Sequence, residues 1–168
     1  MSKAFTKDDD AGELPLAPPR RPALPADVPN YVTPRGLAQL QAELQAELAR
    51  ELPSSDQDTE RARAHLLRAS RLAELEARIA TAVLVHPDQQ PRDEARFGAE
   101  VTVRNLAGAV RSYRIVGVDE ADAGRAALAF TAPLARALLG KRVGEAAPVS
   151  TPAGEDELEI LAISYDPP

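Results

Sequence analysis

Leucines recur at helical spacing near the start of the second quarter of the chain, at positions 37, 40, 44, 48 and 52. Steps of three and four residues place them on one face of a helix. Thr33 is a good N-cap residue, Pro34 suits the first helical position and Pro53 stops the helix. Gly36 is unusual in the first turn, because glycine lowers helix stability. The pattern predicts an amphipathic helix from Pro34 to Leu52.

A second helical pattern follows a short polar turn and runs to about Leu84. Residues 54–58 offer several N-caps for it, and acidic side chains suit its positive end. Its expected apolar face consists of Leu66 or Leu67, Ala69, Leu72, Leu75, Ile79 and Val83. Both apolar stripes are narrow, and each helix has one partner. We therefore expect an antiparallel two-helix coiled-coil hairpin that projects from the protein, rather than a bundle.

The hydrophobic period changes to two after a linker at residues 87–95. Five segments read as strands, at residues 97–106, 110–118, 126–130, 146–150 and 157–165. Pro133–Leu139 reads as one short helix closed by Gly140. The sequence thus predicts an α+β protein in four parts, which are a leader (1–30), the hairpin (31–86), the linker (87–95) and a C-terminal β-sheet domain (96–168).

The leader is rich in proline, with six prolines between Pro15 and Pro29. Proline fixes φ and removes a backbone donor, so this stretch suits neither a helix interior nor a paired strand. We expect an extended, disordered leader. A peptide that docks on a partner is the alternative interpretation.

Composition excludes several classes of function. The net charge is −6 and the pI about 5.0, which argues against a protein that grips duplex nucleic acid through a basic face. The chain has no cysteine and only His65 and His86, so thiolate catalysis and Cys- or His-rich metal sites are excluded. No apolar run is long enough to span a membrane, and the N-terminus lacks a secretory signal, so a cytoplasmic protein is expected.

An acidic cluster falls where the two predicted helices reverse direction. Its members are Asp56, Asp58 and Glu60. One interpretation is helix capping and solvation. The other is that carboxylates at the end of a long rod reach a distant site and share a Mg²⁺ there, since Mg²⁺ takes one or two carboxylates plus water.

Arginines form a stripe along the second helix, at Arg61, Arg68, Arg71 and Arg78. They either pair with glutamates of the arm or contact a phosphate backbone or an acidic protein channel. The glycines never form a phosphate-binding loop, and a Ser/His/Asp set would have to use one of the two histidines. A free-standing enzyme is therefore not expected.

Two C-terminal segments carry a family resemblance. YRIVGVDEAD at 113–122 and TAPLARALLGKRVG at 131–144 resemble the C-terminal domain of the bacterial transcript cleavage factors GreA and GreB. YVTPRGLAQLQAEL at 31–44 resembles the start of their hairpin, and RLAELEARI at 71–79 resembles its returning helix. The Pro-rich leader is more similar to that of GreB-type proteins.

The resemblance implies an FKBP-like C-terminal domain that docks on the rim of the secondary channel of bacterial RNA polymerase. It implies a hairpin that enters the channel towards the 3′ end of the nascent RNA, where tip carboxylates help the polymerase's own Mg²⁺ cut backtracked RNA. The protein would then be an accessory factor that binds no metal stably and needs no cofactor beyond that shared Mg²⁺. The docking residues that follow by position are Pro133, Leu134, Arg136, Leu138, Gly140 and Lys141.

The tip departs from the family pattern. Counted back without gaps from Arg78, Asp58 falls on the family's acidic Asp, but Arg61 falls on its Glu. Both helices are also shorter by about seven to nine residues, which removes about 10 to 13 Å of reach. We expect a polymerase-binding elongation regulator whose stimulation of cleavage is weakened or absent. The alternatives are an active cleavage factor that uses the tip carboxylates, and an FKBP-like peptidyl-prolyl isomerase, which the scarcity of aromatic residues disfavours.

Overall fold

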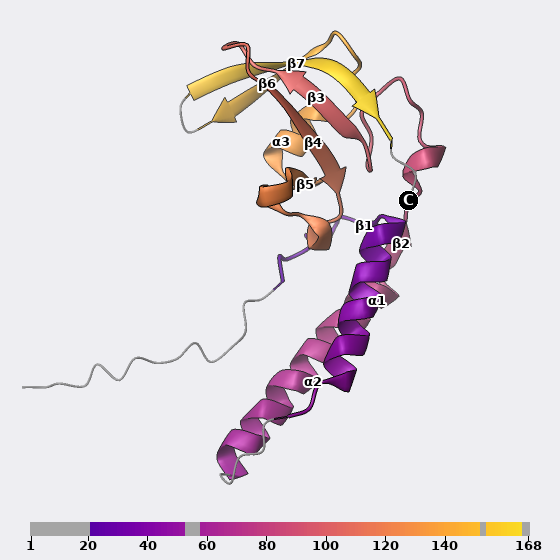
Figure 1. The fold of residues 1–168 in the computed structure, drawn as a ribbon, viewed down its shortest axis with the longest axis vertical. Helices are drawn as coiled ribbons and strands as arrows, with labels where there is room; N and C mark the ends of the chain where they lie inside the picture. The colour runs from indigo at the N-terminus through magenta and orange to yellow at the C-terminus, as the bar shows by residue number, and fades with distance from the viewer. Residues whose placement is uncertain (1–20, 53–57, 152–153, 166–168) are drawn as a thin grey trace, which may run out of the picture.

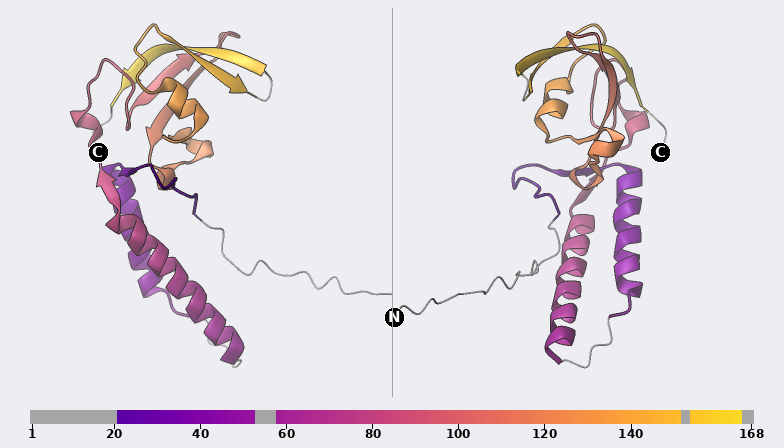
Figure 2. Two further views of the ribbon diagram at one scale, coloured as in Figure 1. Left: turned by 180° about the vertical axis from the view of Figure 1, so that it is seen from behind. Right: turned by 60° about the vertical axis from the view of Figure 1, so that its left-hand side comes forward.

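A two-helix arm projects from a curled β-sheet (Figure 1). The computed structural model describes residues 21–52, 58–151 and 154–165. The arm consists of α1 (Pro34–Ala49) and α2 (Asp58–Ala80), which pack side by side and run in opposite directions (Figure 2). None of the helices within the described ranges has the length and apolar character needed to cross a bilayer. With a helical arm and a β-sheet, the molecule has a mixed α and β architecture, as the sequence predicts.

The predicted seam of the arm forms at its base. Leu40 and Leu75 are buried against each other's helices, with Leu37, Leu44 and Ile79 packed around them. Thr33 is the N-cap of α1, and its side chain accepts a hydrogen bond from the Gly36 N–H at 3.0 Å. Hydrophobic periodicity and capping chemistry thus located this part of the arm correctly.

The predicted seam is wrong towards the tip. α1 ends at Ala49 rather than Leu52, and α2 extends beyond it, so its first turns have no helix beside them (Figure 1). Leu66 is 72% exposed and Ala69 is exposed as well, whereas Leu67, the predicted alternative to Leu66, is half-buried. A two-helix seam buries a side chain only where both helices are present, so the periodic pattern alone could not show where burial stops.

The predicted end of the second helix at Leu84 is also wrong. α2 ends at Ala80, and β2 (Ala82–Leu84) pairs in parallel with β1 (Asn30–Val32). The Asn30 amide donates to the Arg78 carbonyl at 2.9 Å and to the Thr81 hydroxyl at 3.2 Å. The first bond gives a partner to one of the carbonyls in the last turn of α2. Val83, predicted on the apolar helix face, lies in β2 and is exposed.

The C-terminal sheet contains the five predicted strands in the order β5-β4-β3-β7-β6. The strands are β3 (Glu100–Arg104), β4 (Val110–Val116), β5 (Ala127–Ala129), β6 (Ala146–Thr151) and β7 (Gly154–Ser164). All neighbours are antiparallel except β4 and β5, which are parallel. The short α3 (Pro133–Leu138) covers one face, and Gly140 follows it with a φ of 79°, a left-handed value that glycine adopts without strain.

The sheet and α3 enclose a continuous apolar core. Its largest fully buried members are Val101, Val103, Ile115, Leu138 and Ile160. Three short 3₁₀ turns lie outside the sheet, namely η1 (Pro87–Gln89), η2 (Val118–Glu120) and η3 (Ala123–Arg125). The η2 turn contacts β1 at the base of the arm and therefore belongs to the junction between arm and domain.

Three aromatic rings meet at the same junction. Tyr31 of β1 lies with its ring centroid 5.8 Å from that of Phe97 and 5.5 Å from that of Phe130, and the latter two rings are 5.7 Å apart. Tilted and edge-on rings at these distances are a favourable aromatic arrangement. The fold brings these residues together from β1, from the segment before β3 and from the residue after β5.

Candidate docking surface and arm tip

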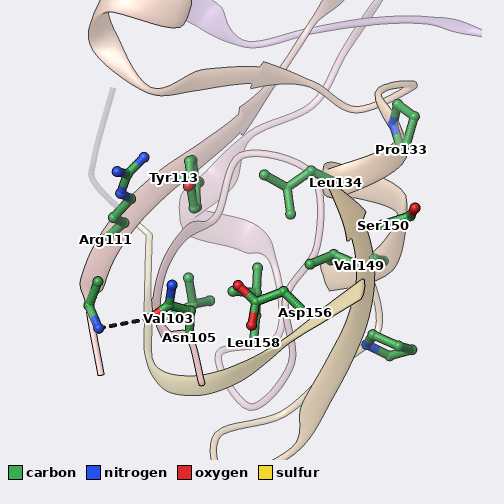
Figure 3. Close-up of a pocket in the computed structure, with 13 residues that line it drawn as sticks. Val103, Asn105, Arg111, Tyr113, Pro133, Leu134, Val149, Ser150, Asp156 and Leu158 are labelled. Carbon is green, nitrogen blue, oxygen red and sulfur yellow. Dashed lines mark hydrogen bonds between the residues drawn. The ribbon is translucent and has the colours of Figure 1, made fainter. Parts of the chain in front are cut away.

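A groove opens between α3 and the sheet of the C-terminal domain (Figure 3). Its volume is about 560 Å³, and Tyr113, Leu134, Val149 and Leu158 form much of its apolar lining. Arg111 is exposed on β4 at one side of the groove. A concave apolar surface with charged groups beside it is suited to holding a side chain or a peptide. Among the described residues that line it, Tyr113 is the only aromatic one, unlike in an aromatic-lined proline pocket.

The residues predicted for docking separate into surface and core. Pro133 and Arg136 are exposed on α3, and Leu134 lines the groove. Leu138 is fully buried in the domain core, so its side chain cannot contact a partner. Leu134 lies one turn earlier on the same side of α3, but it is only partly buried and packs at the edge of that core.

The Gly140–Lys141 segment is held by the backbone of the domain. Gly140 N–H donates to the Ala95 carbonyl, and Ala95 N–H donates to the Lys141 carbonyl, both at 2.7 Å. Gly140 is exposed and Lys141 half-buried. The two residues thus form a fixed surface next to α3.

The turn between β3 and β4 adds apolar surface that the sequence analysis missed. Leu106 and Val110 are 76% and 56% exposed. Asn105 and Ala109 line the groove, and the Asn105 side chain accepts a hydrogen bond from the Ala109 N–H at 2.8 Å (Figure 3). The available signal was the pair of large apolar residues on both sides of a turn at Gly108.

The candidate tip carboxylates lie at the far end of the arm. Asp58 and Glu60 are in the first turn of α2, and the Asp58 side chain is 96% exposed. The Arg61 guanidinium is 3.5 Å from the Asp58 carboxylate. Asp56 falls outside the described residues. Among the residues that are described, no group of three acidic, histidine or cysteine side chains could hold a metal ion.

Three arginines of the stripe contact the protein itself, whereas Arg61 is exposed near the tip. Arg68 donates to the Leu48 carbonyl at 2.6 Å, and Arg71 lies 3.9 Å from the Glu47 carboxylate. Arg78 lies 3.7 Å from Asp119 at the junction. These contacts link the two helices, and link α2 to the C-terminal domain.

The comparison with known proteins points to one family. Residues 90–165 match the family model described as transcription elongation factor, GreA/GreB, C-term. GreA of Methylococcus capsulatus is 39% identical over 97 residues, which cover 56% of this chain and only 61% of that protein. GreA of Hyphomonas neptunium is 32% identical over 151 residues, covering 80% of this chain and 96% of that protein. GreB of Neisseria meningitidis is 30% identical over 159 residues, covering 84% and 98%.

The two longer alignments include the arm as well as the sheet domain, and they extend over nearly the whole length of both relatives. The similarity is therefore not confined to the C-terminal sheet. The chain belongs to the GreA/GreB family of transcription elongation factors.

Proposed function

We propose that this protein binds bacterial RNA polymerase through its C-terminal domain and regulates elongation with little or no stimulation of RNA cleavage. In this account the domain has an FKBP-like fold, and the arm is a short coiled coil directed into the secondary channel. The observation that carries the proposal is the exposed surface of α3 beside the groove, within the segment that matches the family model.

The chemistry of that surface suits a protein partner. Pro133 and Leu134 present apolar surface at the start of α3, and Arg136 adds an exposed positive charge on the same helix. Interfaces are typically formed by an apolar centre with a polar or charged rim. We place the polymerase contact on Pro133, Leu134, Arg136 and the neighbouring Gly140–Lys141 backbone.

The weak-cleavage half of the proposal depends on the arm tip. α2 has 23 residues, equivalent to about 35 Å at 1.5 Å per residue. A carboxylate must come within about 2 Å of a Mg²⁺ to coordinate it, so a small deficit in reach prevents ligation. Arg61 lies 3.5 Å from Asp58, and although this exposed ion pair is weak, its positive charge disfavours a second cation at the same carboxylate.

A competition experiment tests the binding half. Labelled protein is bound to core polymerase, and an intact Gre factor is then titrated in. We expect full displacement, since both proteins would use the same site. Arg136→Glu should weaken binding by about tenfold through charge reversal at the rim. The matched control is Arg92→Glu in the exposed linker, which should leave the affinity unchanged. Binding that the Gre factor fails to displace would contradict the proposal.

An active cleavage factor is the second candidate, favoured by the exposure of Asp58 at the extreme end of the arm. It predicts short 3′ RNA fragments from backtracked complexes, and their loss in Asp58→Ala. The first proposal predicts no fragments above the polymerase's intrinsic level in either protein.

A further inference from the structure

One carboxylate of the C-terminal domain completes the start of the arm. Glu120, at the end of η2, accepts hydrogen bonds from the Thr33 N–H at 3.1 Å and the Gly117 N–H at 3.2 Å, both on the same oxygen. The Thr33 hydroxyl donates to the other oxygen of Glu120. Because Thr33 in turn caps the Gly36 N–H, the carboxylate is bonded to the cap of α1.

The Glu120 carboxylate fits beside α1 because position 36 is a glycine. A Cβ atom there would lie 2.1 Å from Cδ of Glu120 and 2.3 Å from its Oε2. Gly117 is similar, since its Cβ would lie 2.7 Å from the Tyr31 carbonyl oxygen. Gly36 lowers the intrinsic stability of the helix, so its presence in the first turn is explained by this close approach.

The neighbouring carboxylate holds the other helix. The Asp119 side chain is only 3% exposed, with Arg21 Nη1 at 3.2 Å and Arg78 Nε, from the last turn of α2, at 3.7 Å. Arg21 also pairs with Glu43 of α1. Removal of one member would leave a buried charge uncompensated, which is strongly unfavourable.

We propose that the adjacent carboxylates Asp119 and Glu120 are positioning residues that set the direction of the arm on the C-terminal domain. Glu120 fixes the start of α1 and Asp119 fixes the end of α2, so two consecutive residues hold both helices at the base. The leverage is large, because a tilt of about 10° at the base displaces the end of a helix of about 35 Å by about 6 Å.

Distance measurements on the protein alone test this proposal. The chain contains no cysteine, so Ser70→Cys on α2 and Ala162→Cys on β7 provide two unique and exposed spin-label sites. Pulsed electron-paramagnetic-resonance distances should show one narrow population in the parent protein. Asp119→Asn and Glu120→Gln should broaden it or shift it by about 2 to 3 Å, because Ser70 lies about 15 Å along α2 from its base and a tilt of roughly 10° moves it by that amount.

Gly36→Ala provides the sharpest variant, because helix propensity and the proposal predict opposite results. Propensity alone predicts a more stable α1 with an unchanged arm. The proposal predicts that the added methyl group displaces Glu120 and disturbs the label distance as Glu120→Gln does.

The matched control is Glu145→Gln, since Glu145 also accepts a backbone N–H, from Arg142, but far from the arm. It should keep the parent distance distribution. Unchanged distributions in Glu120→Gln and Asp119→Asn would overturn the proposal, even if Gly36→Ala failed to fold. Because polymerase is absent, this result is independent of the proposed binding function.

Discussion

The sheet domain and the arm differ in how far their cores extend. In the domain, buried residues from four strands and α3 form one connected cluster. In the arm, the buried apolar residues are Val32, Leu40 and Leu75, and the side chains nearer the tip are at most half-buried. A helix with one partner buries a single narrow stripe, so the arm depends on its base. The domain can hold a docking surface by itself, whereas the arm needs the junction to keep its direction.

The largest effect is expected from a cavity in the domain core. Leu138→Ala should lower the free energy of unfolding by about 2 to 5 kcal/mol, because Leu138 is completely buried. Guanidinium denaturation followed by circular dichroism measures this change. Arg136→Ala, an exposed neighbour on the same helix, should change it by less than about 0.5 kcal/mol. Equal losses in both variants would contradict the assignment of Leu138 to the core.

The arm seam should give a smaller and more local effect. Leu75→Ala should lower the free energy of unfolding of the arm by about 2 kcal/mol, because Leu75 is buried in the seam. The helical circular-dichroism signal at 222 nm should then be lost at a lower denaturant concentration than in the parent. Tertiary signals from the sheet domain should persist. Leu66→Ala, on the same helix but exposed, should be neutral or slightly stabilising. If Leu66→Ala were as costly as Leu75→Ala, the seam would extend to the tip and the comparison would fail.

A smaller effect is expected at the end of the last strand. The Tyr165 hydroxyl donates to the Glu94 carbonyl at 2.6 Å and accepts from the Arg96 N–H at 2.9 Å. Tyr165→Phe should therefore cost about 1 kcal/mol in the free energy of unfolding of the domain. The arm helicity should be unaffected.

The same tyrosine gives a pH dependence with a defined sign. Burial raises the pKa of Tyr165 above its ordinary value. The folded state then holds the phenolic proton more tightly than the unfolded state, so its contribution to stability is complete below about pH 10. That contribution is lost as the pH rises through the raised pKa. Urea midpoints measured from pH 9 to 11 should fall more steeply in the parent than in Tyr165→Phe, and parallel curves would contradict the assignment.

The smallest effect on stability is expected at the tip. Asp58→Ala should change the free energy of unfolding by less than about 0.5 kcal/mol, since the side chain is 96% exposed. Thermal denaturation checks this expectation. A larger loss would show that Asp58 has a structural role in starting α2.

Local patterns predicted much of the fold. Alternating hydrophobicity located all five strands, and Thr33 with Pro34 located the start of α1. The pairing of β1 with β2 was not predictable, because each strand has three residues and the partners are far apart in sequence. The extent of the buried seam along the arm was not predictable either, since Leu66 and Leu67 fit the helical period equally well.

The features of the site that sequence could not predict depend on contacts between residues far apart in the chain. Gly36 could be recognised only as a weak point of a helix, because the carboxylate that needs its space comes from Glu120. For docking, the resemblance indicated α3 but gave no reason to include the β3–β4 turn. Burial then separated Leu138 from its exposed neighbours, which a residue-by-residue correspondence cannot do.

Our proposal is that this protein occupies the polymerase site with little or no stimulation of cleavage. The most direct measurement is RNA cleavage in backtracked complexes, with an intact GreA present at a fixed concentration and this protein titrated in. We expect GreA-dependent 3′ fragments to fall towards the intrinsic level as this protein saturates the site, and this protein alone to add few or none above that level. Cleavage by GreA that stays constant, or fragments from this protein alone that vanish in Asp58→Ala, would contradict it.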